Sequence, residues 1–196
     1  MSAPSPDSPI RVDWLDATEL GSGGRLGMTI LPGKHGASLR YPGLVYRRDL
    51  ADDLDGLLAQ GVRHLLLLVD DEELARWGDP DIVVRAAEIG LAITRRPLRD
   101  GTAPATMEAM DAMLAELAAA RTASDVAVAC MGGVGRSGTV AACALVAAGA
   151  SAAEAIRRVR VVRHPTAVET EEQVAFVEAY ERHVAERGGA SYKVAR

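Results

Sequence analysis

The sequence has little of what disulfide-bonded, metal-binding and membrane-spanning proteins require. Its two cysteines, Cys130 and Cys143, are too few for a disulfide framework or a cysteine-rich zinc site. Its four histidines are scattered and show no metal-ligand spacing. The longest apolar run, residues 139–153, is mostly alanine and is too short to cross a bilayer. We therefore predict no metal, no other cofactor and no membrane association.

Positive charge is also in short supply. The formal net charge is −5, which argues against a nucleic-acid partner. The first residues lack the apolar core of a signal peptide, so a reducing, cytoplasmic setting is the default expectation. What is present is ordinary for a globular protein: 196 residues, 48% of them apolar and 25% charged. That length fits one domain with a sizeable core.

Composition divides the chain into three parts. Residues 1–9 are rich in proline and serine and are expected to form a disordered tail, and residues 188–196 are expected to form a C-terminal tail. Between them, residues 10–187 show no internal repeat and no change of composition, which predicts a single domain. The sequence does not determine the oligomeric state, and a monomer is the default expectation.

Strand and helix patterns alternate through this domain. Short apolar or alternating runs predict strands, and apolar residues at helical spacing predict helices. The predicted strands cover residues 12–15, 26–31, 64–69, 91–98 and 125–130. The predicted helices cover residues 47–60, 80–89, 104–121, 137–148, 151–162 and 170–186. This alternation predicts an α/β three-layer sandwich, with a mostly parallel sheet of about five strands and helices on both faces.

A glycine-rich stretch follows the last predicted strand, at the carboxyl end where open α/β sheets bind ligands. Gly133, Gly135 and Gly138 match the spacing of a dinucleotide-binding turn. The region about 20 residues further on is a basic helical pattern, however, instead of a second strand ending in an acidic residue. A nucleotide-binding phosphate loop needs a lysine before its serine or threonine, and none is near. Both alternatives are therefore rejected.

The remaining interpretation rests on Cys130, five intervening residues, Arg136 and Ser137. Because three of the intervening residues are glycines, the backbone can curl with its N–H groups inward and bind a phosphate dianion at a helix N-terminus. Arg136 supplies a planar fork for phosphate oxygens, and its positive field favours a Cys130 thiolate nucleophile. Ser137 can donate a hydrogen bond to the departing sulfur. The predicted phosphate-binding residues are Met131, Gly132, Gly133, Val134, Gly135 and Arg136.

This motif resembles the Cys-x5-Arg-Ser signature of the cysteine-dependent protein tyrosine and dual-specificity phosphatases. Residues 26–33, 97–104 and 132–137 resemble, in that order, segments of the kinase-associated (cyclin-dependent kinase inhibitor-like) dual-specificity phosphatases. The resemblance extends over residues 10–185 and implies a protein tyrosine phosphatase-like fold. It also implies that Asp100 is the general acid and that Gln173 helps to place the attacking water.

The local sequence around Asp100, Gln173 and Cys130 affects how these roles are interpreted. Asp100 follows a predicted strand in an Asp-Gly turn, at the same sheet end as Cys130, and a simple turn former is the alternative. Gln173 also fits a capping box that starts at Thr170, which would occupy its side chain locally. The residue before the nucleophile is Ala129, where the resembled family usually has a histidine that stabilises the thiolate. The thiolate pKa and the turnover rate are therefore open.

The sequence predicts a phosphomonoester hydrolase that acts on a phosphorylated protein through a phosphocysteine intermediate. The uncharged loop residues 131–135 favour a singly phosphorylated target, phosphotyrosine and/or phosphoserine/threonine. One alternative is a catalytically weak or inactive module that binds phosphate or a phosphoprotein, which Ala129 favours. Another is a rhodanese-type sulfur transferase, which has no need of an acid such as Asp100.

Other patterns in the sequence are assigned to structure. Cys143 lies in an alanine-rich helical pattern and is expected in the core, with a redox partner for Cys130 as the alternative. Methionines at helical spacing, at 107, 110 and 113, are also expected in the core. A run of arginines is expected on a solvated helix face, with a docking patch for an acidic partner as the alternative. The run consists of Arg157, Arg158, Arg160 and Arg163.

Overall fold

A five-stranded sheet forms the centre of the molecule. The computed structural model describes residues 8–38 and 40–193, with side chains as far as residue 187. The strand order is β1-β2-β7-β5-β6. β1 pairs antiparallel with β2, and the other neighbouring pairs are parallel. This confirms the predicted α/β sheet. The strands are β1 (Asp13–Trp14), β2 (Leu26–Ile30), β5 (Val62–Leu67), β6 (Ala92–Arg95) and β7 (Asp125–Cys130).

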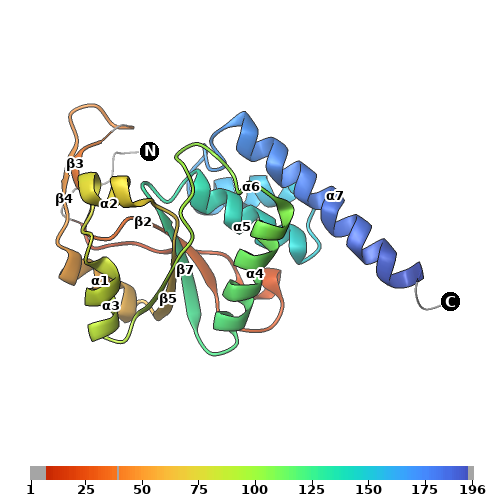
Figure 1. Cartoon of the computed structure of the whole chain (residues 1–196), viewed down its shortest axis with the longest axis horizontal. Helices are drawn as coiled ribbons and strands as arrows, with labels where there is room; N and C mark the ends of the chain where they lie inside the picture. The colour runs from red at the N-terminus through yellow and green to blue at the C-terminus, as the bar shows by residue number, and fades with distance from the viewer. Residues whose placement is uncertain (1–7, 39, 194–196) are drawn as a thin grey trace.

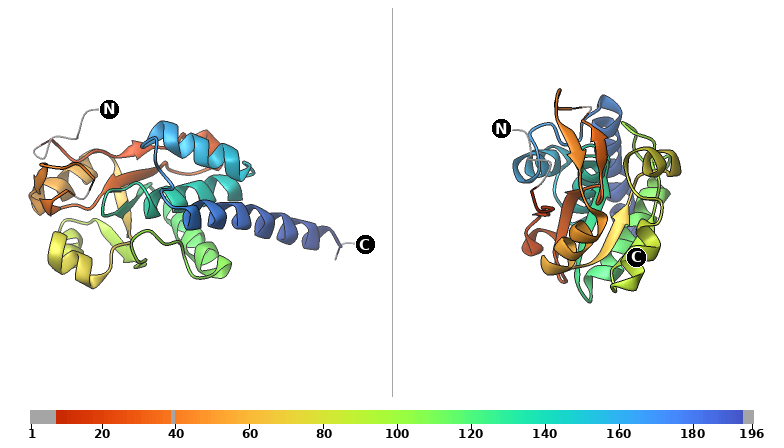
Figure 2. Two further views of the ribbon diagram at one scale, coloured as in Figure 1. Left: turned by 90° about the horizontal axis from the view of Figure 1, so that it is seen from above. Right: turned by 90° about the vertical axis from the view of Figure 1, so that its left-hand side faces the viewer.

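Helices cover both faces of this sheet, as predicted (Figure 1, Figure 2). One face carries α1 (Leu50–Ala59), α2 (Asp71–Trp77) and α3 (Ile82–Glu88). The other face carries α4 (Met107–Arg121), α5 (Arg136–Ala147), α6 (Ala152–Val162) and α7 (Glu171–Lys193). The result is a three-layer arrangement with an apolar core on each side of the sheet.

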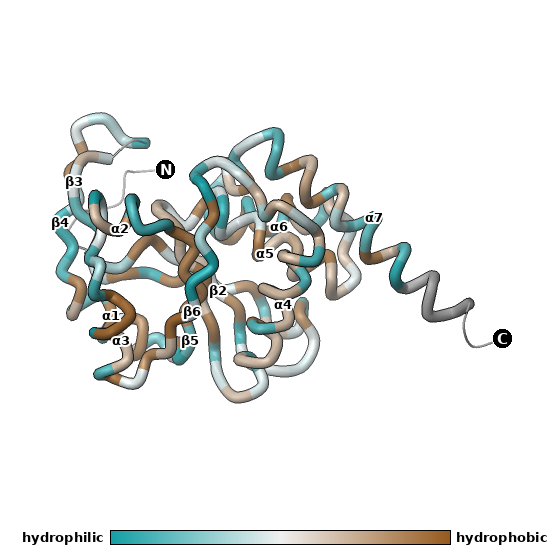
Figure 3. The backbone as a smooth tube through the Cα atoms, viewed as in Figure 1, coloured by the Kyte–Doolittle hydropathy of each residue, from teal (hydrophilic) through white to brown (hydrophobic). Residues whose placement is uncertain are grey.

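The two cores divide the side chains of β7 between them. Val126 and Val128 belong to the core beneath α4 and α5, whereas Ala127 and Ala129 belong to the core beneath α1 and α3. Because side chains alternate along a strand, Cys130 at its end belongs to the α5 side. The apolar residues of α1, which is brown in Figure 3, belong to the core on the other side of the sheet, whereas β5 contributes residues to both cores.

Two of the methionines assigned to the core are buried there. Met110 and Met113 belong to the core on the α4 side, and Met107 packs against it half-buried, so this prediction is confirmed. Cys143 is fully buried in α5, which confirms its placement in the core.

Several short elements were not predicted. They are the 3₁₀ turn η1 (Ala17–Leu20), the hairpin of β3 (His35–Ala37) with β4 (Val45–Arg47), and α2. The seven residues of α2 bury only Leu74, and the hairpin strands bury only Tyr46. An apolar pattern needs more than one buried residue before its period can be recognised.

The last helix is longer than predicted. α7 continues to Lys193, past the predicted end at residue 186, so residues 188–193 of the expected tail are helical. Residues 194–196, and residues 1–7 of the expected N-terminal tail, lie outside the described residues. Within the described chain, no helix combines the length and the apolar character that a membrane span would need.

Candidate active site

Residues 130–136, hereafter the phosphate loop, connect the end of β7 to the start of α5. Gly133 has a φ of +67°, and a Cβ there would collide with the carbonyl oxygen of Thr29. A Cβ at Gly135 would collide with the carboxylate of Glu169. No side chain in the described part of the chain caps the N-terminus of α5. The first N–H groups of that helix therefore remain available to an anion.

Cys130 ends β7 and is buried at the base of the phosphate loop. Burial opposes ionisation, but the charge of Arg136, the side chain of Ser137 and the backbone N–H groups of Ser137 and Val134 hold the pKa of the Cys130 thiol below its ordinary value. The Ser137 hydroxyl is buried and has no other hydrogen-bond partner within residues 8–38 and 40–193. The Ser137 hydroxyl is therefore free to donate a hydrogen bond to the Cys130 sulfur.

The guanidinium of Arg136 is 1% exposed and tightly held. Glu73 accepts hydrogen bonds with both carboxylate oxygens, at 2.6 Å from Nη1 and 2.7 Å from Nη2. Nη1 also donates to the carbonyl oxygen of Leu98 at 2.8 Å. The third nitrogen, Nε, is buried and has no partner among the described residues. The guanidinium is thus fixed by Glu73 with the Nε–H left for a phosphate oxygen.

Glu73 is a site residue that the sequence analysis missed. It forms a capping box with Asp70 at the start of α2, where each backbone N–H donates to the other residue's carboxylate, at 2.8 and 3.2 Å. Burial disfavours the charged form of Arg136 and by itself would lower its pKa, but the hydrogen bonds with Glu73 raise the pKa of the guanidinium above its ordinary value. The Asp70-x-x-Glu73 spacing signals a helix start, but it carries no sign of a partner 63 residues further along the chain.

Asp100 lies on the loop that follows β6, in a turn with Gly101. Its Oδ1 atom is 2.9 Å from Nη2 of Arg136, and its side chain is 70% exposed. Asp100 and Cys130 line the same cavity. The structure therefore brings together the three residues predicted to carry the chemistry: nucleophile, arginine and acid.

The start of α7 holds the loop that carries the candidate acid. Thr170 Oγ1 donates to the carbonyl oxygen of Gly101 at 2.8 Å, and Gln173 Nε2 donates to that of Thr102 at 3.1 Å. Gln173 Oε1 accepts from the N–H of Glu169 at 2.8 Å and from that of Thr170 at 3.4 Å. The Gln173 N–H donates to Thr170 Oγ1 at 3.2 Å, which completes the capping box.

Gln173 therefore lies near the site and also belongs to the capping box at the start of α7. It lies beside the phosphate loop, because its side chain is among the atoms nearest to Gly135, yet it is fully buried and its amide is engaged by the backbone. The side chain of this segment that lines the cavity is Glu169, which is paired with Arg40.

The site opens into a cavity of about 730 Å³, hereafter the active-site cavity. Cys130, Met131, Gly132 and Val134 of the phosphate loop line it on one side. Basic and aromatic side chains line much of the remainder: Arg11, Lys34, Arg40, Tyr41, Tyr46, Arg48, Trp77, Arg163 and His164. A volume of this size is typical of a ligand site and is more than one phosphoryl group requires.

Lys34, on the connection from β2 to β3, is a second site residue that the sequence analysis missed. Its Nζ atom donates to the carbonyl oxygen of Met131 at 3.2 Å and lies 4.3 Å from the centre of the Tyr46 ring. Burial lowers the pKa of Lys34 to about 8, a shift that the neighbouring Cys130 opposes. The phosphate loop is uncharged between its cysteine and arginine, but its surroundings contribute a buried cation.

The arginine run of α6 does not form a solvated face throughout. Arg163 is an inward support of the phosphate loop: Nε donates to the carbonyl oxygen of Gly133 and Nη2 to that of Gly132, each at 2.9 Å. Its Nη1 pairs with Asp13 at 2.5 Å. The prediction of a solvated residue is therefore wrong for Arg163, because loop carbonyls need donors once the loop has curled.

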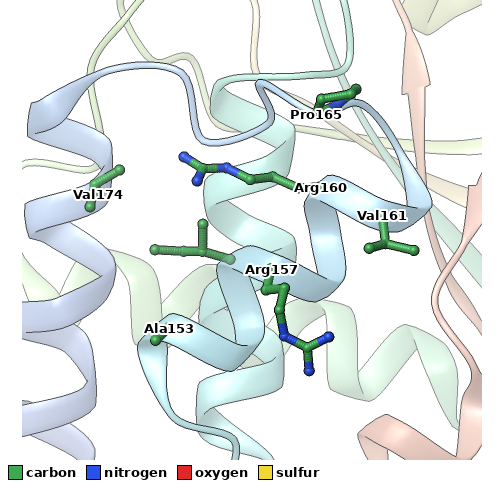
Figure 4. Close-up of a pocket in the computed structure, with 7 residues that line it drawn as sticks. Ala153, Arg157, Arg160, Val161, Pro165 and Val174 are labelled. Carbon is green, nitrogen blue, oxygen red and sulfur yellow. The ribbon is translucent and has the colours of Figure 1, made fainter.

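Arg157 and Arg160 are exposed, which confirms the prediction for these two residues, and Arg158 is half-buried. Arg158 pairs with Glu19, and Arg160 donates to the carbonyl oxygen of Ala167 at 3.0 Å. Figure 4 shows Arg157 and Arg160 beside a second cavity, of about 630 Å³, between α6 and the start of α7. No nucleophile or carboxylate lines this cavity among the described residues. The active-site cavity is therefore the one that holds reactive groups.

Two further observations concern thiol and metal chemistry. Burial raises the pKa of the Cys143 thiol well above its ordinary value, so this thiol stays protonated. Both cysteines are free. Over residues 8–38 and 40–193, no group of three or more histidine, cysteine or carboxylate side chains is arranged to hold a metal ion.

The fold and the Cys-x5-Arg loop define a protein of the tyrosine and dual-specificity phosphatase superfamily. Within it, residues 3–156 match the family described as cyclin-dependent kinase inhibitor 3 (CDKN3), and the chain belongs to this family. The resemblance inferred from the sequence is thereby confirmed. A comparison with curated proteins gave no significant match.

Solved structures of several phosphatases share this fold. The kinase associated phosphatase, with its catalytic-site cysteine substituted by serine, matches with a TM-score of 0.80 at 24% identity, over 91% of this chain and 98% of that one. Tk-PTP in its active form matches with a TM-score of 0.66 at 29% identity, over 87% and 96%. PTPMT1 in complex with PI(5)P matches with a TM-score of 0.63 at 16% identity, over 83% and 94%.

Proposed function

We propose that this protein is a metal-independent phosphomonoester hydrolase that acts on phosphoproteins through a phosphocysteine intermediate. The observation that carries the proposal is that Cys130 and Asp100 line one cavity, while the guanidinium of Arg136 lies 2.9 Å from Asp100 and acts on the Cys130 thiol through its charge. Membership of a phosphatase family supports a protein substrate. The phosphorylated residue is phosphotyrosine and/or phosphoserine/threonine.

The first half-reaction transfers the phosphoryl group to sulfur. The Cys130 thiolate attacks phosphorus in line, the S–P bond forms and the bond to the substrate oxygen breaks. The free Nε–H of Arg136 and the N–H groups of the phosphate loop hold the equatorial oxygens, where charge develops in the transition state. The Asp100 carboxylic acid gives its proton to the leaving oxygen, and the dephosphorylated hydroxyl departs.

The second half-reaction releases phosphate. The Asp100 carboxylate takes a proton from water, which attacks the phosphocysteine as the S–P bond breaks. The buried hydroxyl of Ser137 donates a hydrogen bond to the departing sulfur, which regenerates the thiolate. Gln173 contributes by holding the Asp100 loop at Thr102, and the placement of the attacking water relative to Asp100 depends on that loop.

Hydrolysis of p-nitrophenyl phosphate in the presence of EDTA tests the proposal. We expect turnover by the wild type, none by Cys130→Ser, and a loss on the order of 10²-fold in kcat with Asp100→Asn. Cys143→Ser is the matched control, because its thiol is buried and protonated, and it should retain wild-type turnover. Turnover that depends on added metal, or that survives in Cys130→Ser, would refute the phosphocysteine mechanism.

The alternative of a binding module is favoured by Ala129, which stands where the family usually has a histidine. This position is fully buried in the apolar core on the α1 side of the sheet. Absence of turnover combined with tight binding of vanadate or a phosphotyrosine peptide would establish that function. A persulfide on Cys130 without phosphatase activity would instead indicate sulfur transfer.

A further inference from the structure

The active-site cavity contains more cationic surface than the hydrolysis of one phosphate group requires. We propose that Lys34 forms a second anion subsite, which selects protein substrates that carry an acidic group beside the phosphorylated residue. This proposal rests on the proposed function and specifies its substrate class. The acidic group is a carboxylate or a second phosphate on a residue next to the one that is dephosphorylated.

The Lys34 ammonium group has few partners within the protein. Only 6% of the residue is exposed. One of its three N–H donors binds the carbonyl oxygen of Met131, and the Tyr46 ring provides a cation–π contact. No carboxylate among the described residues lies within salt-bridge distance of Nζ, although a buried cation is costly without an anionic partner. The Cys130 thiolate is a neighbouring negative charge, but an anion that enters the cavity can pair with the Lys34 ammonium group directly.

The arginines of the cavity, in contrast to Lys34, are already paired. Each of those that line it makes an ion pair with a carboxylate of the protein. The pairs are Arg11 with Asp13, Arg40 with Glu169, Arg48 with Asp53 and Arg163 with Asp13. Of the lysine and arginine side chains that line the cavity in the described chain, Lys34 alone lacks such a partner. Asp13 serves both Arg11 and Arg163, so one arginine charge also remains uncompensated, but the Arg11 side chain is 71% exposed to solvent. Lys34 is therefore the buried cation of the cavity that is available to a second substrate anion.

Lys34 also lies close to the proposed nucleophile, Cys130. Its ammonium group donates a hydrogen bond to the carbonyl oxygen of Met131, the residue after Cys130. Lys34 and Cys130 line the same cavity. An anion at Lys34 is therefore a near neighbour of a phosphoryl group at Cys130. Taken alone, the uncharged loop residues 131–135 favour a singly phosphorylated target. Lys34 adds a positive charge beside this loop from the β2–β3 connection, so a second anion on the substrate can also be bound.

A set of matched phosphotyrosine peptides, or phosphothreonine peptides if these are the better substrates, tests the proposal. The residue beside the phosphorylated one is alanine, aspartate or phosphoserine, which separates the two sources of the anion. We expect kcat/KM for an acidic neighbour to exceed that for alanine by about 10-fold, equivalent to one strong ion pair. The ratio should fall to about 1 in Lys34→Met and be largely restored in Lys34→Arg.

Arg11→Met is the matched control. It removes one positive charge from the same cavity, while Asp13 keeps its pair with Arg163, so the ratio between acidic and neutral peptides should stay near the wild-type value. Because the ratio compares two peptides on one enzyme, a general loss of activity in Lys34→Met does not alter its meaning.

The outcomes separate this proposal from the proposed function. Wild-type hydrolysis without preference for acidic neighbours, or a preference that survives in Lys34→Met, would overturn the second subsite and leave the phosphatase mechanism intact. Faster, Lys34-dependent hydrolysis of a short-chain phosphoinositide bisphosphate than of any peptide would overturn the protein substrate. Failure to hydrolyse the peptides and p-nitrophenyl phosphate alike would contradict the proposed function itself.

Discussion

At the residue scale, the proposed mechanism requires a thiolate at Cys130, which here follows Ala129 where the family usually has a histidine. The side chain of Ala129 belongs to the opposite core from Cys130, so it makes no direct contribution to the charge around the sulfur. That contribution comes from Arg136, Ser137 and backbone N–H groups, and it outweighs the effect of burial. The loss of the histidine therefore removes one of several stabilising influences.

The alkylation rate of Cys130 as a function of pH tests this balance. We expect a midpoint below about 8.5, because the pKa of the thiol is lowered and the reactive thiolate is present at lower pH than in a free cysteine. Ser137→Ala should raise the midpoint toward that ordinary value. The measurement is made in Cys143→Ser to leave one thiol. A wild-type midpoint at or above about 8.5 would contradict the prediction.

Some residues around the candidate site could be predicted from the sequence, and others could not. Cys130, Arg136 and Ser137 could be assigned because the chemistry of their loop depends on local spacing. Glu73 and Lys34 could not, because each reaches the loop from a different element through a contact that no local pattern records. The prediction for Arg163 was wrong for the same reason, since its partners are backbone carbonyls of the loop.

At the scale of elements, the N-terminus of α7 acts as a clamp on the loop that carries Asp100. Thr170 and Gln173 each donate a side-chain hydrogen bond to a backbone carbonyl of that loop, at Gly101 and Thr102. The Glu172 carboxylate also accepts from the N–H of Ala103 at 3.3 Å. These bonds link the start of a helix directly to the position of the candidate acid.

Gln173→Ala should therefore impair acid catalysis in particular. Phenyl phosphate has a poorer leaving group than p-nitrophenyl phosphate and depends more on proton donation, so its kcat should fall about 10-fold further. The kcat ratio of the two substrates is the measurement. Glu178→Gln, at an exposed site on the same helix, should leave the ratio unchanged. Equal losses for both substrates would indicate a purely structural role for Gln173.

The number of regularly spaced buried residues in an element explains whether the sequence could predict it. The strand 125–130 and the helices 104–121 and 151–162 have several buried residues at a regular spacing, and each was located to within three residues. Helix α2 and the β3–β4 hairpin bury one residue each and were not predicted. Because Glu73 lies in α2, the missed helix and the missed partner of Arg136 are one omission.

At the scale of the whole molecule, the alternation of strands and helices was enough to predict the sheet and its two covered faces. Parallel strands end at the same edge, so Asp100 after β6 and Cys130 after β7 were expected to converge, although β5 lies between them. How α7 is fastened to the domain could not be predicted. Besides its apolar packing against the core, α7 makes a polar contact with Asp111 of α4, which accepts hydrogen bonds from Tyr180 at 2.7 Å and His183 at 2.9 Å and pairs with Arg187.

This contact predicts a pH-dependent contribution to stability. Burial opposes the ionisation of Asp111, but the hydrogen bonds from Tyr180 and His183 and the charge of Arg187 hold its pKa below the ordinary value. A carboxylate of lowered pKa stabilises the fold above the unfolded pKa of about 3.9, and this contribution is lost as the pH falls through the folded pKa. Asp111→Asn should therefore lower the free energy of unfolding by about 1–2 kcal/mol at pH 7.

Urea unfolding of wild type and Asp111→Asn at pH 7 and at about pH 3 measures this contribution, because the difference between the two proteins should narrow in acid. Glu178→Gln removes one exposed carboxylate from the partner helix and should match the wild type at both pH values. A difference that stays constant between the two pH values would mean that the substitution acts through altered hydrogen bonds with Tyr180 and His183 and that the charge of Asp111 contributes nothing. A narrowing difference would show that this charge strengthens the contact between α4 and the helix whose other end positions the Asp100 loop.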